Sequence, residues 1–173
     1  MWKALLLGLL SASAWSQPPA SPDRWKDLRF LIGEWTGEGG GGGAGQGAGS
    51  FSFTPQLGGK ILVRRNVADY PAANGKPAVH HEDVMTVYLE AEGKAPEAIY
   101  FDNEGHVIHY VVEVNPSGKV VRFVSRVQAG EPRYRLTYRE ADKDLVTGQF
   151  ELAPPGKPEA FDRYMEWSAR RKK

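Results

Sequence analysis

The sequence contains no cysteine, so no disulfide bond links any part of the chain and no lipid can be attached through a lipobox cysteine. The fold must therefore be held together by side-chain packing. A composition of 41% hydrophobic and 11% aromatic residues in 173 is ample for one domain with a single core.

The chain also lacks an excess of charge of either sign, with 22 lysines and arginines against 21 aspartates and glutamates. Removing residues 1–16 takes away only Lys3 and leaves 21 of each. Because proteins that bind nucleic acid are usually basic, no nucleic-acid partner is expected. The four basic residues 170–173 are interpreted as a solvated chain end.

Long apolar runs are absent except for Ala4 to Ala14, which follows a short basic start. This run is shorter than the roughly 20 residues that span a bilayer, and small residues follow it, so residues 1–16 are predicted to be a secretory signal peptide. Cleavage after Ala14 or after Ser16 satisfies the peptidase. We expect a periplasmic or secreted protein with no membrane span once the signal is removed.

The rest of the chain divides into a short lead and one domain. Residues 17–29 are predicted to be a linker, rich in Pro, Ser and Ala, with a helical turn over 23–30 that Ser21 or Asp23 can cap. Residues 30–173 are predicted to form the domain.

From Leu31 onward the hydrophobic pattern has a period of two, which indicates strands separated by turn residues every eight to twelve positions. The predicted strands are 31–38, 48–54, 59–69, 81–90, 96–103, 106–114, 119–127, 132–140, 144–152 and 160–170. Tight turns at 103–105 and 115–118 join neighbouring strands as hairpins. Such a series hides its edges most simply by closing, so we predict an all-β, antiparallel up-and-down barrel of about ten strands, with a β-sandwich as the alternative.

Eight glycines lie between residues 39 and 49. Gly37, Gly39 and Gly42 match the spacing of a dinucleotide-binding loop, but that loop needs a following helix, and the pattern here predicts none. The segment is interpreted as a loop between the first two strands.

Alternation along each strand assigns its more apolar set to the interior. On 59–69 this choice carries Arg65 inward, and on 81–90 it carries Asp83 inward. Tyr110, Tyr138 and Trp167 face inward on later strands, with Arg163 on the last. The predicted inward partners are Ile61, Val63, Val67, Met85, Val87, Leu89, Ile108, Val112, Val121, Phe123, Ser125, Tyr134, Leu136, Phe161 and Met165.

Apolar walls with a few polar groups are typical of a cavity that binds a small apolar or amphipathic molecule. The candidate ligand-binding residues are Trp35, Arg65, Asp83, Tyr110, Tyr138, Arg163 and Trp167. If the ligand carries a carboxylate, the two arginines are its natural partners. Two alternatives stay open: the charges pair with one another as a structural network, or Asp83 or Tyr138 acts as acid or base in an enzyme.

The four histidines are His80, His81, His106 and His109. Adjacent strand residues point to opposite faces, as do residues three apart, so this spacing assembles no metal site. His81 and Asp83 do share a face. Asp102 and Glu104 are interpreted as turn or rim charges.

The stretch Leu31-Ile-Gly-Glu-Trp35-Thr-Gly resembles the opening strand of lipocalin-like (calycin) barrels. The chain also resembles a bacterial family of exported proteins of unknown function, on that stretch, on Leu57 to Leu62, and on the hairpin from Tyr100 to Gly105. The lipocalin resemblance implies that Trp35 packs on a basic side chain from the end of the barrel, Arg163 or Arg170.

Nitrobindin-like haem proteins have a similar opening, and that resemblance implies haem bound by a histidine late in the chain. The last histidine here is His109, so the final strands offer no such ligand. Haem binding would require His109 to point inward, and no cofactor is expected.

Overall fold

The computed structural model describes residues 23–173 except 43–46, 74, 76 and 92. It contains one short 3-10 helix and ten strands: η1 (Lys26–Leu31), β1 (Gly33–Gly42), β2 (Ala48–Gln56), β3 (Ile61–Tyr70), β4 (Val79–Tyr88), β5 (Glu97–Asp102), β6 (Val107–Val114), β7 (Val120–Ser125), β8 (Arg133–Asp142), β9 (Leu145–Ala153) and β10 (Asp162–Arg171). Each predicted strand is present, with ends that differ by a few residues.

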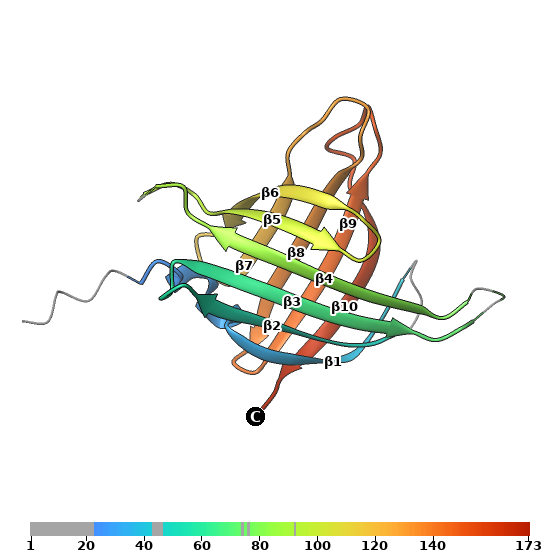
Figure 1. Cartoon of the computed structure of the whole chain (residues 1–173), viewed down its shortest axis with the longest axis horizontal. Coiled ribbons are helices and arrows are strands. Elements are labelled where there is room, and N and C mark those ends of the chain that lie inside the picture. The colour runs from blue at the N-terminus through green and yellow to red at the C-terminus, as the bar shows by residue number, and fades with distance from the viewer. Residues whose placement is uncertain (1–22, 43–46, 74, 76, 92) are drawn as a thin grey trace, which may run out of the picture.

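The strands form one closed antiparallel barrel in which every strand pairs with its neighbours in sequence and β1 pairs with β10. This confirms the predicted up-and-down barrel and excludes the sandwich. Figure 1 shows β2 to β4 crossing in front of β8 and β9 at a steep angle. Closure leaves none of the ten described strands at an unpaired edge.

One end of the barrel is closed by η1. Leu28 and Leu31 of this helix are buried, and Trp25 just before it donates its indole N–H to the carbonyl of Gly59 in the β2–β3 turn, at 2.8 Å. The predicted turn over 23–30 is thus a 3-10 helix starting three residues later. Asp23 accepts a hydrogen bond from the backbone N–H of Trp25 at 3.1 Å, and Ser21 lies outside the described residues.

Trp35 packs at the closed end with Arg171. The guanidinium carbon of Arg171 lies 4.2 Å from the centre of the indole ring, and the indole N–H donates to the Leu31 carbonyl at 2.8 Å. The expectation of Arg163 or Arg170 was wrong, because Trp35 is in register with Arg171 and directly paired residues share a face. Arg171 also donates to the carbonyls of Phe30 and Ile32, which ties both ends of the domain together.

Gly33 leaves the space that the Arg171 guanidinium occupies. Its φ is +126°, and a Cβ built at Gly33 would lie 2.7 Å from Nη1 of Arg171. The Gly-x-Trp opening therefore has a physical reason: glycine admits the arginine that stacks on Trp35.

The glycine-rich segment is not only a loop. Gly40, Gly41 and Gly42 belong to β1 and pair with Trp167, Glu166 and Met165 of β10. Backbone pairing does not need side chains, so the strand continues through glycines that a sequence pattern assigns to a loop. Residues 43–46 lie outside the described part of the chain.

The predicted signal peptide (1–16) and residues 17–22 of the predicted linker also lie outside the described residues. In the part of the chain that is described, no helix is both long enough and apolar enough to span a membrane.

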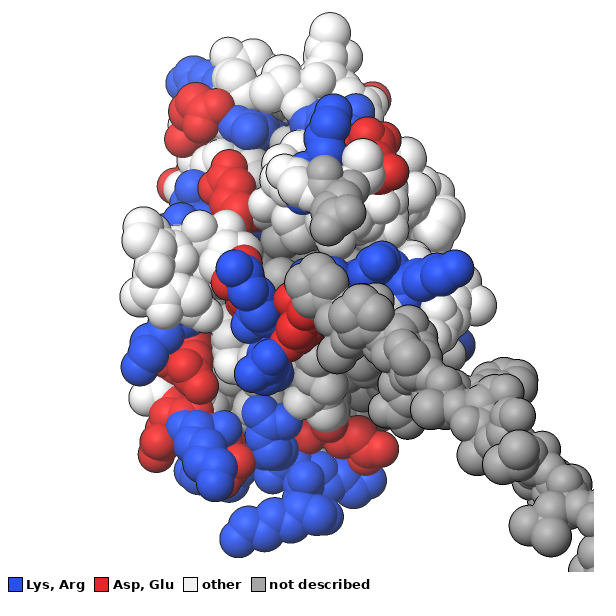
Figure 2. Space-filling model, turned by 90° about the vertical axis from the view of Figure 1, so that its left-hand side faces the viewer, with Lys and Arg blue, Asp and Glu red and all other residues white. Residues whose placement is uncertain are grey.

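Figure 2 shows the face on the η1 side of the barrel, with basic and acidic side chains intermixed. Two ion pairs join the first strand to the end of the chain: Arg170 of β10 with Glu38 at 2.5 Å, and Lys172, just after β10, with Glu34 at 3.1 Å. These pairs are largely exposed, so solvent screening leaves each with little effect on stability.

The role of Gly33 predicts a difference between two Gly→Ala variants. Gly58 also has a positive φ, +65°, but nothing lies within 4 Å of its would-be Cβ. Gly58→Ala should lower the free energy of unfolding by about 1–2 kcal/mol from backbone strain alone. Gly33→Ala adds the displacement of Arg171 and should cost at least about 1 kcal/mol more. Urea unfolding of both variants checks this, and equal losses would contradict the Arg171 contact.

Candidate functional site

The predicted inward faces of four strands are confirmed. Asp83, Met85, Tyr110, Val121 and Tyr138, from β4, β6, β7 and β8, are all buried. Except for the polar Asp83, they belong to the packed hydrophobic core inside the barrel. Trp35 is buried at the closed end, so four of the seven candidate ligand-binding residues, Trp35, Asp83, Tyr110 and Tyr138, lie inside.

The inward face of β3 was predicted wrongly. Arg65 is exposed, and Arg64 is buried with Leu62 on the opposite face of the strand. The apolar set Ile61, Val63 and Val67 is only partly buried and faces outward. The rule that the more apolar face points inward fails here because the interior near β3 is polar, with Arg64 and its partners replacing apolar packing.

Arg64 is the centre of a buried polar network. It forms an ion pair with Asp83, and its Nε–H donates to the Tyr138 hydroxyl at 2.8 Å. The two charged side chains are only 5% and 3% exposed. Asp83 accepts a further hydrogen bond from the Asn66 amide at 2.9 Å. The charge is therefore compensated inside the barrel, as burial of ions requires.

The network continues toward the end of the barrel opposite η1, which we call the open end. Nε2 of His81 lies 3.2 Å from Oδ2 of Asp83 and 3.4 Å from the Tyr100 hydroxyl. Tyr100 donates to Oδ2 of Asp102 at 3.1 Å. His81 and Tyr100 are only partly buried, so this is where the network reaches solvent.

The electrostatics of the network fix most protonation states. Burial raises the pKa of Tyr138 to about 12 despite the nearby Arg64 cation, so its phenol is a hydrogen-bonding group at neutral pH. Burial and the negative charges of Asp83 and Asp102 raise the pKa of Tyr100 well above its usual value. The hydrogen bond to Asp83, reinforced by Glu104, raises the pKa of His81 against the effect of its burial.

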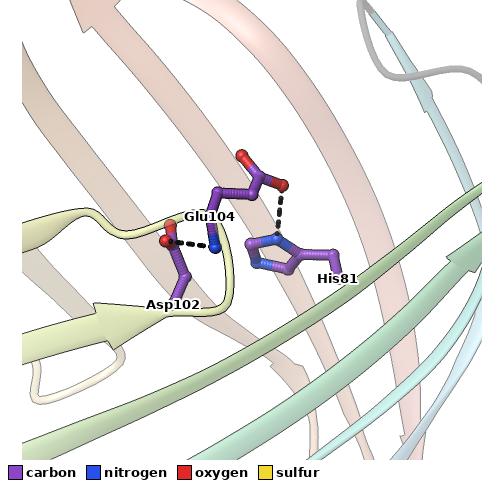
Figure 3. Close-up of side chains that lie close together, drawn as sticks. All are labelled: His81, Asp102 and Glu104. Atoms are coloured by element: carbon purple, nitrogen blue, oxygen red, sulfur yellow. Dashed lines mark hydrogen bonds and ion pairs between the residues drawn. The ribbon is translucent and has the colours of Figure 1, made fainter.

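The β5–β6 turn holds a second group of charged side chains. Asp102 accepts hydrogen bonds from the backbone N–H groups of Glu104 and His106 at 3.0 and 2.9 Å, and Nδ1 of His106 lies 2.8 Å from its other oxygen. Glu104 reaches Nδ1 of His81 at 3.1 Å. Figure 3 shows His81 on β4 and Glu104 on the turn facing one another, with Asp102 beside them.

Metal-binding atoms are thus brought together although histidine spacing does not predict it. One ligand atom each from His81, Asp102 and Glu104 lies within 4.8 Å of the others. His80 does point away, toward Asp69 at 2.6 Å, as expected for adjacent residues of a strand. The cluster was missed because its carboxylates come from the end of β5 and the β5–β6 turn, with Glu104 23 residues beyond His81 in the sequence. Only the pairing of Asp102 with Asp83 across the sheet brings them beside His81.

Trp167 lies on the inner face of β10 and contacts Tyr138 edge to face, with ring centres 6.0 Å apart. Its register partner is Gly148 of β9, and a Cβ built at Gly148 would lie 2.1 Å from the indole ring. The absence of a side chain at Gly148 is what admits the indole. The predicted inward orientation of Trp167 is therefore correct.

Arg163 does not face inward, contrary to expectation. A β-bulge separates Arg163 from Met165 in the pairing with β9. The extra residue shifts the alternation, so Arg163 is exposed and pairs with Glu166 at 2.6 Å. The predicted inward orientation of Phe161 is also wrong. Its ring packs on the outer face, with its centre 4.1 Å from the guanidinium carbon of Arg135.

Arg163 instead borders an open, largely apolar hollow of about 360 Å³ on the rim between β9 and β10. Its lining residues are Pro132, Leu152, Ala153, Pro154, Asp162, Arg163 and Tyr164. This hollow is separate from the Arg64 network.

His109 is not placed to bind haem iron inside the barrel, and Asp83 and Tyr138 are not placed to act as an acid and base pair. His109 is exposed on β6, and its side chain points to the opposite face from the buried Tyr110. It therefore cannot reach the interior as an iron ligand. Asp83 and Tyr138 are both engaged by Arg64. The structural-network alternative therefore describes these two residues better than an acid and base pair.

No family model and no curated protein match this sequence. Among solved structures with a similar fold is the crystal structure of Rv2717c from M. tuberculosis. The TM-score is 0.58 at 16% sequence identity, and the similarity covers 88% of this chain and 99% of that chain. At this identity the likeness shows a barrel fold alone, and the lipocalin-like and exported-family resemblances remain predictions.

The buried pair predicts effects of very different size for the replacement of two adjacent arginines. Arg64→Met leaves the Asp83 carboxylate buried without its cation and should lower the free energy of unfolding by roughly 3–5 kcal/mol. Arg65→Met removes an exposed charge of the same type and should change it by less than about 0.5 kcal/mol. Denaturant unfolding measures both, and a reversed order would restore the inward orientation of Arg65.

Proposed function

We propose that this protein is an exported barrel that binds a small amphipathic molecule through its open end. The observation that carries the proposal is the partly exposed polar network of His81 and Tyr100 above the buried Arg64–Asp83 pair. A few polar groups within apolar and aromatic walls are typical of small-molecule sites.

The two ends of the barrel differ in a way that favours this role. The closed end is covered by η1, whose Leu28 and Leu31 are buried in the core. The open half carries aromatic rings: Tyr100 meets Tyr110 edge to face at 6.3 Å, and Tyr134 stacks on Phe150 at 6.0 Å. Such rings suit an apolar or planar body, and His81 and Tyr100 suit a polar head.

The polar groups also indicate which head group fits. Arg64 is already engaged by Asp83 and Tyr138, and Arg65 and Arg163 are outside the barrel. An anionic head therefore has no free arginine among these three. Because the Tyr100 hydroxyl already donates to Asp102, we infer a ligand with a neutral head that donates a hydrogen bond to the Tyr100 oxygen or contacts the His81 ring.

Export rests on the sequence. The apolar run from Ala4 to Ala14 after a basic start supports a signal peptide, and we propose a periplasmic or secreted location on that basis. A fold held by packing without cysteine is compatible with such a compartment.

A matched pair of variants tests the binding site. Ala68 of β3 is in register with His81 and shares its inward face, whereas Val67 is on the outer face and in register with Glu82. Ala68→Trp should fill the open end and abolish binding, and Val67→Trp should leave it intact. Native mass spectrometry of protein purified from its own host detects the bound molecule as a mass increment.

The expected result is an increment in the wild type and in Val67→Trp that Ala68→Trp lacks, with circular dichroism showing all three folded. Retention of the increment by folded Ala68→Trp, or its absence from the wild type, would contradict a ligand at the open end.

A further inference from the structure

We propose that His81, Asp102 and Glu104 form a binding site for one divalent transition-metal cation at the rim of the open end. One imidazole nitrogen and two carboxylate oxygens lie within 4.8 Å of one another. Because Zn–N and Zn–O bonds are about 2.0–2.2 Å long, atoms this close together can surround one zinc ion after small side-chain rotations. Figure 3 shows the three side chains drawn together from β4 and the β5–β6 turn.

The backbone holds the two parts of this site in a fixed relation. Asn103, between the two carboxylate residues, extends the pairing with β4: its N–H donates to the Glu82 carbonyl at 3.0 Å, and its amide donates to the His80 carbonyl at 2.9 Å. The amide oxygen in turn accepts the N–H of Glu82 at 3.0 Å. Three hydrogen bonds thus clamp the turn beside His81, so little ordering is left for an ion to impose.

The groups around the site match the surroundings of bound metals. Nε2 of His81 lies 3.2 Å from Asp83, and donation of its N–H there leaves Nδ1 to face Glu104 at 3.1 Å. A carboxylate behind a ligating histidine orients the ring and fixes its tautomer. Asp83 is itself held by Arg64, so this support is rigid.

Asp102 is supported in the same manner. Its side chain is only 4% exposed, with hydrogen bonds from the backbone N–H groups of Glu104 and His106 and from the Tyr100 hydroxyl. Nδ1 of His106 lies 2.8 Å from Oδ2 of Asp102 and 3.9 Å from Glu104. A buried carboxylate at the floor of the cluster, with a second histidine at its edge, makes this more than a group of exposed acidic residues.

The charges and donor atoms indicate the class of ion. Asp83 has Arg64 as its cation, whereas among the described residues Asp102 and Glu104 have only His81 and His106 as basic ion-pair partners. A divalent cation would balance both carboxylates. One imidazole with two carboxylates suits Zn²⁺ and similar first-row ions, with water completing the coordination.

This site goes beyond the proposed small-molecule binding and is tested without any organic ligand. Isothermal titration calorimetry of the metal-free protein with Zn²⁺ should show one site per chain. His81→Gln and Glu104→Gln each remove one ligand and should weaken binding at least tenfold. His109→Gln is the matched control, because the side chain of His109 is exposed on the outer face of β6 and is not part of the cluster.

Co²⁺ gives an independent readout, since its visible absorption bands change when water ligands are replaced by imidazole and carboxylate. We expect these bands in the wild type and in His109→Gln, and their loss in folded His81→Gln. Absence of Zn²⁺ binding by the wild type, or an equal effect of His109→Gln and His81→Gln, would overturn the site.

Discussion

The buried ion pair between Arg64 and Asp83 is the interaction on which the organisation of the barrel interior depends. Arg64 is in register with Met85, and Asp83 with Asn66, so the two charges are diagonal neighbours on adjacent strands. A slip of one residue between β3 and β4 would turn one of them toward solvent and leave the other unpaired. The pair therefore fixes the register of the two strands and places Tyr138, Asn66 and His81 around it.

From this pair the difference between the ends of the barrel follows. Toward η1 the interior is apolar and is sealed by the contact of Arg171 with Trp35. Toward the other end, hydrogen bonds lead from Asp83 through His81 to the β5–β6 turn, where the side chains become exposed. The functional proposals concern that end because polar groups reach solvent there with their orientation already fixed by buried partners.

Much of the fold could be predicted from alternation and turn residues, including ten strands and the inward faces around Asp83, Tyr110 and Tyr138. The failures have local physical causes. On β3 the inner face is the more polar one, so Arg64 was mistaken for a surface residue and Arg65 for a core one. On β10 a bulge before Met165 reversed the facing of Arg163. Predicting the cluster of His81, Asp102 and Glu104 requires knowing which turn lies beside β4. The pattern within a single strand does not contain that information.

The exchange rate of arginine side-chain Nε–H protons tests the central pair most directly. The two Nε–H signals are assigned in a ¹H–¹⁵N spectrum at neutral pH by their loss in Arg64→Lys and in Arg65→Lys. In the structure, the Nε–H of Arg64 donates a hydrogen bond to Tyr138 inside the barrel. The account predicts that this proton exchanges with water far more slowly than that of Arg65. Equal rates, or protection of Arg65 in place of Arg64, would contradict it.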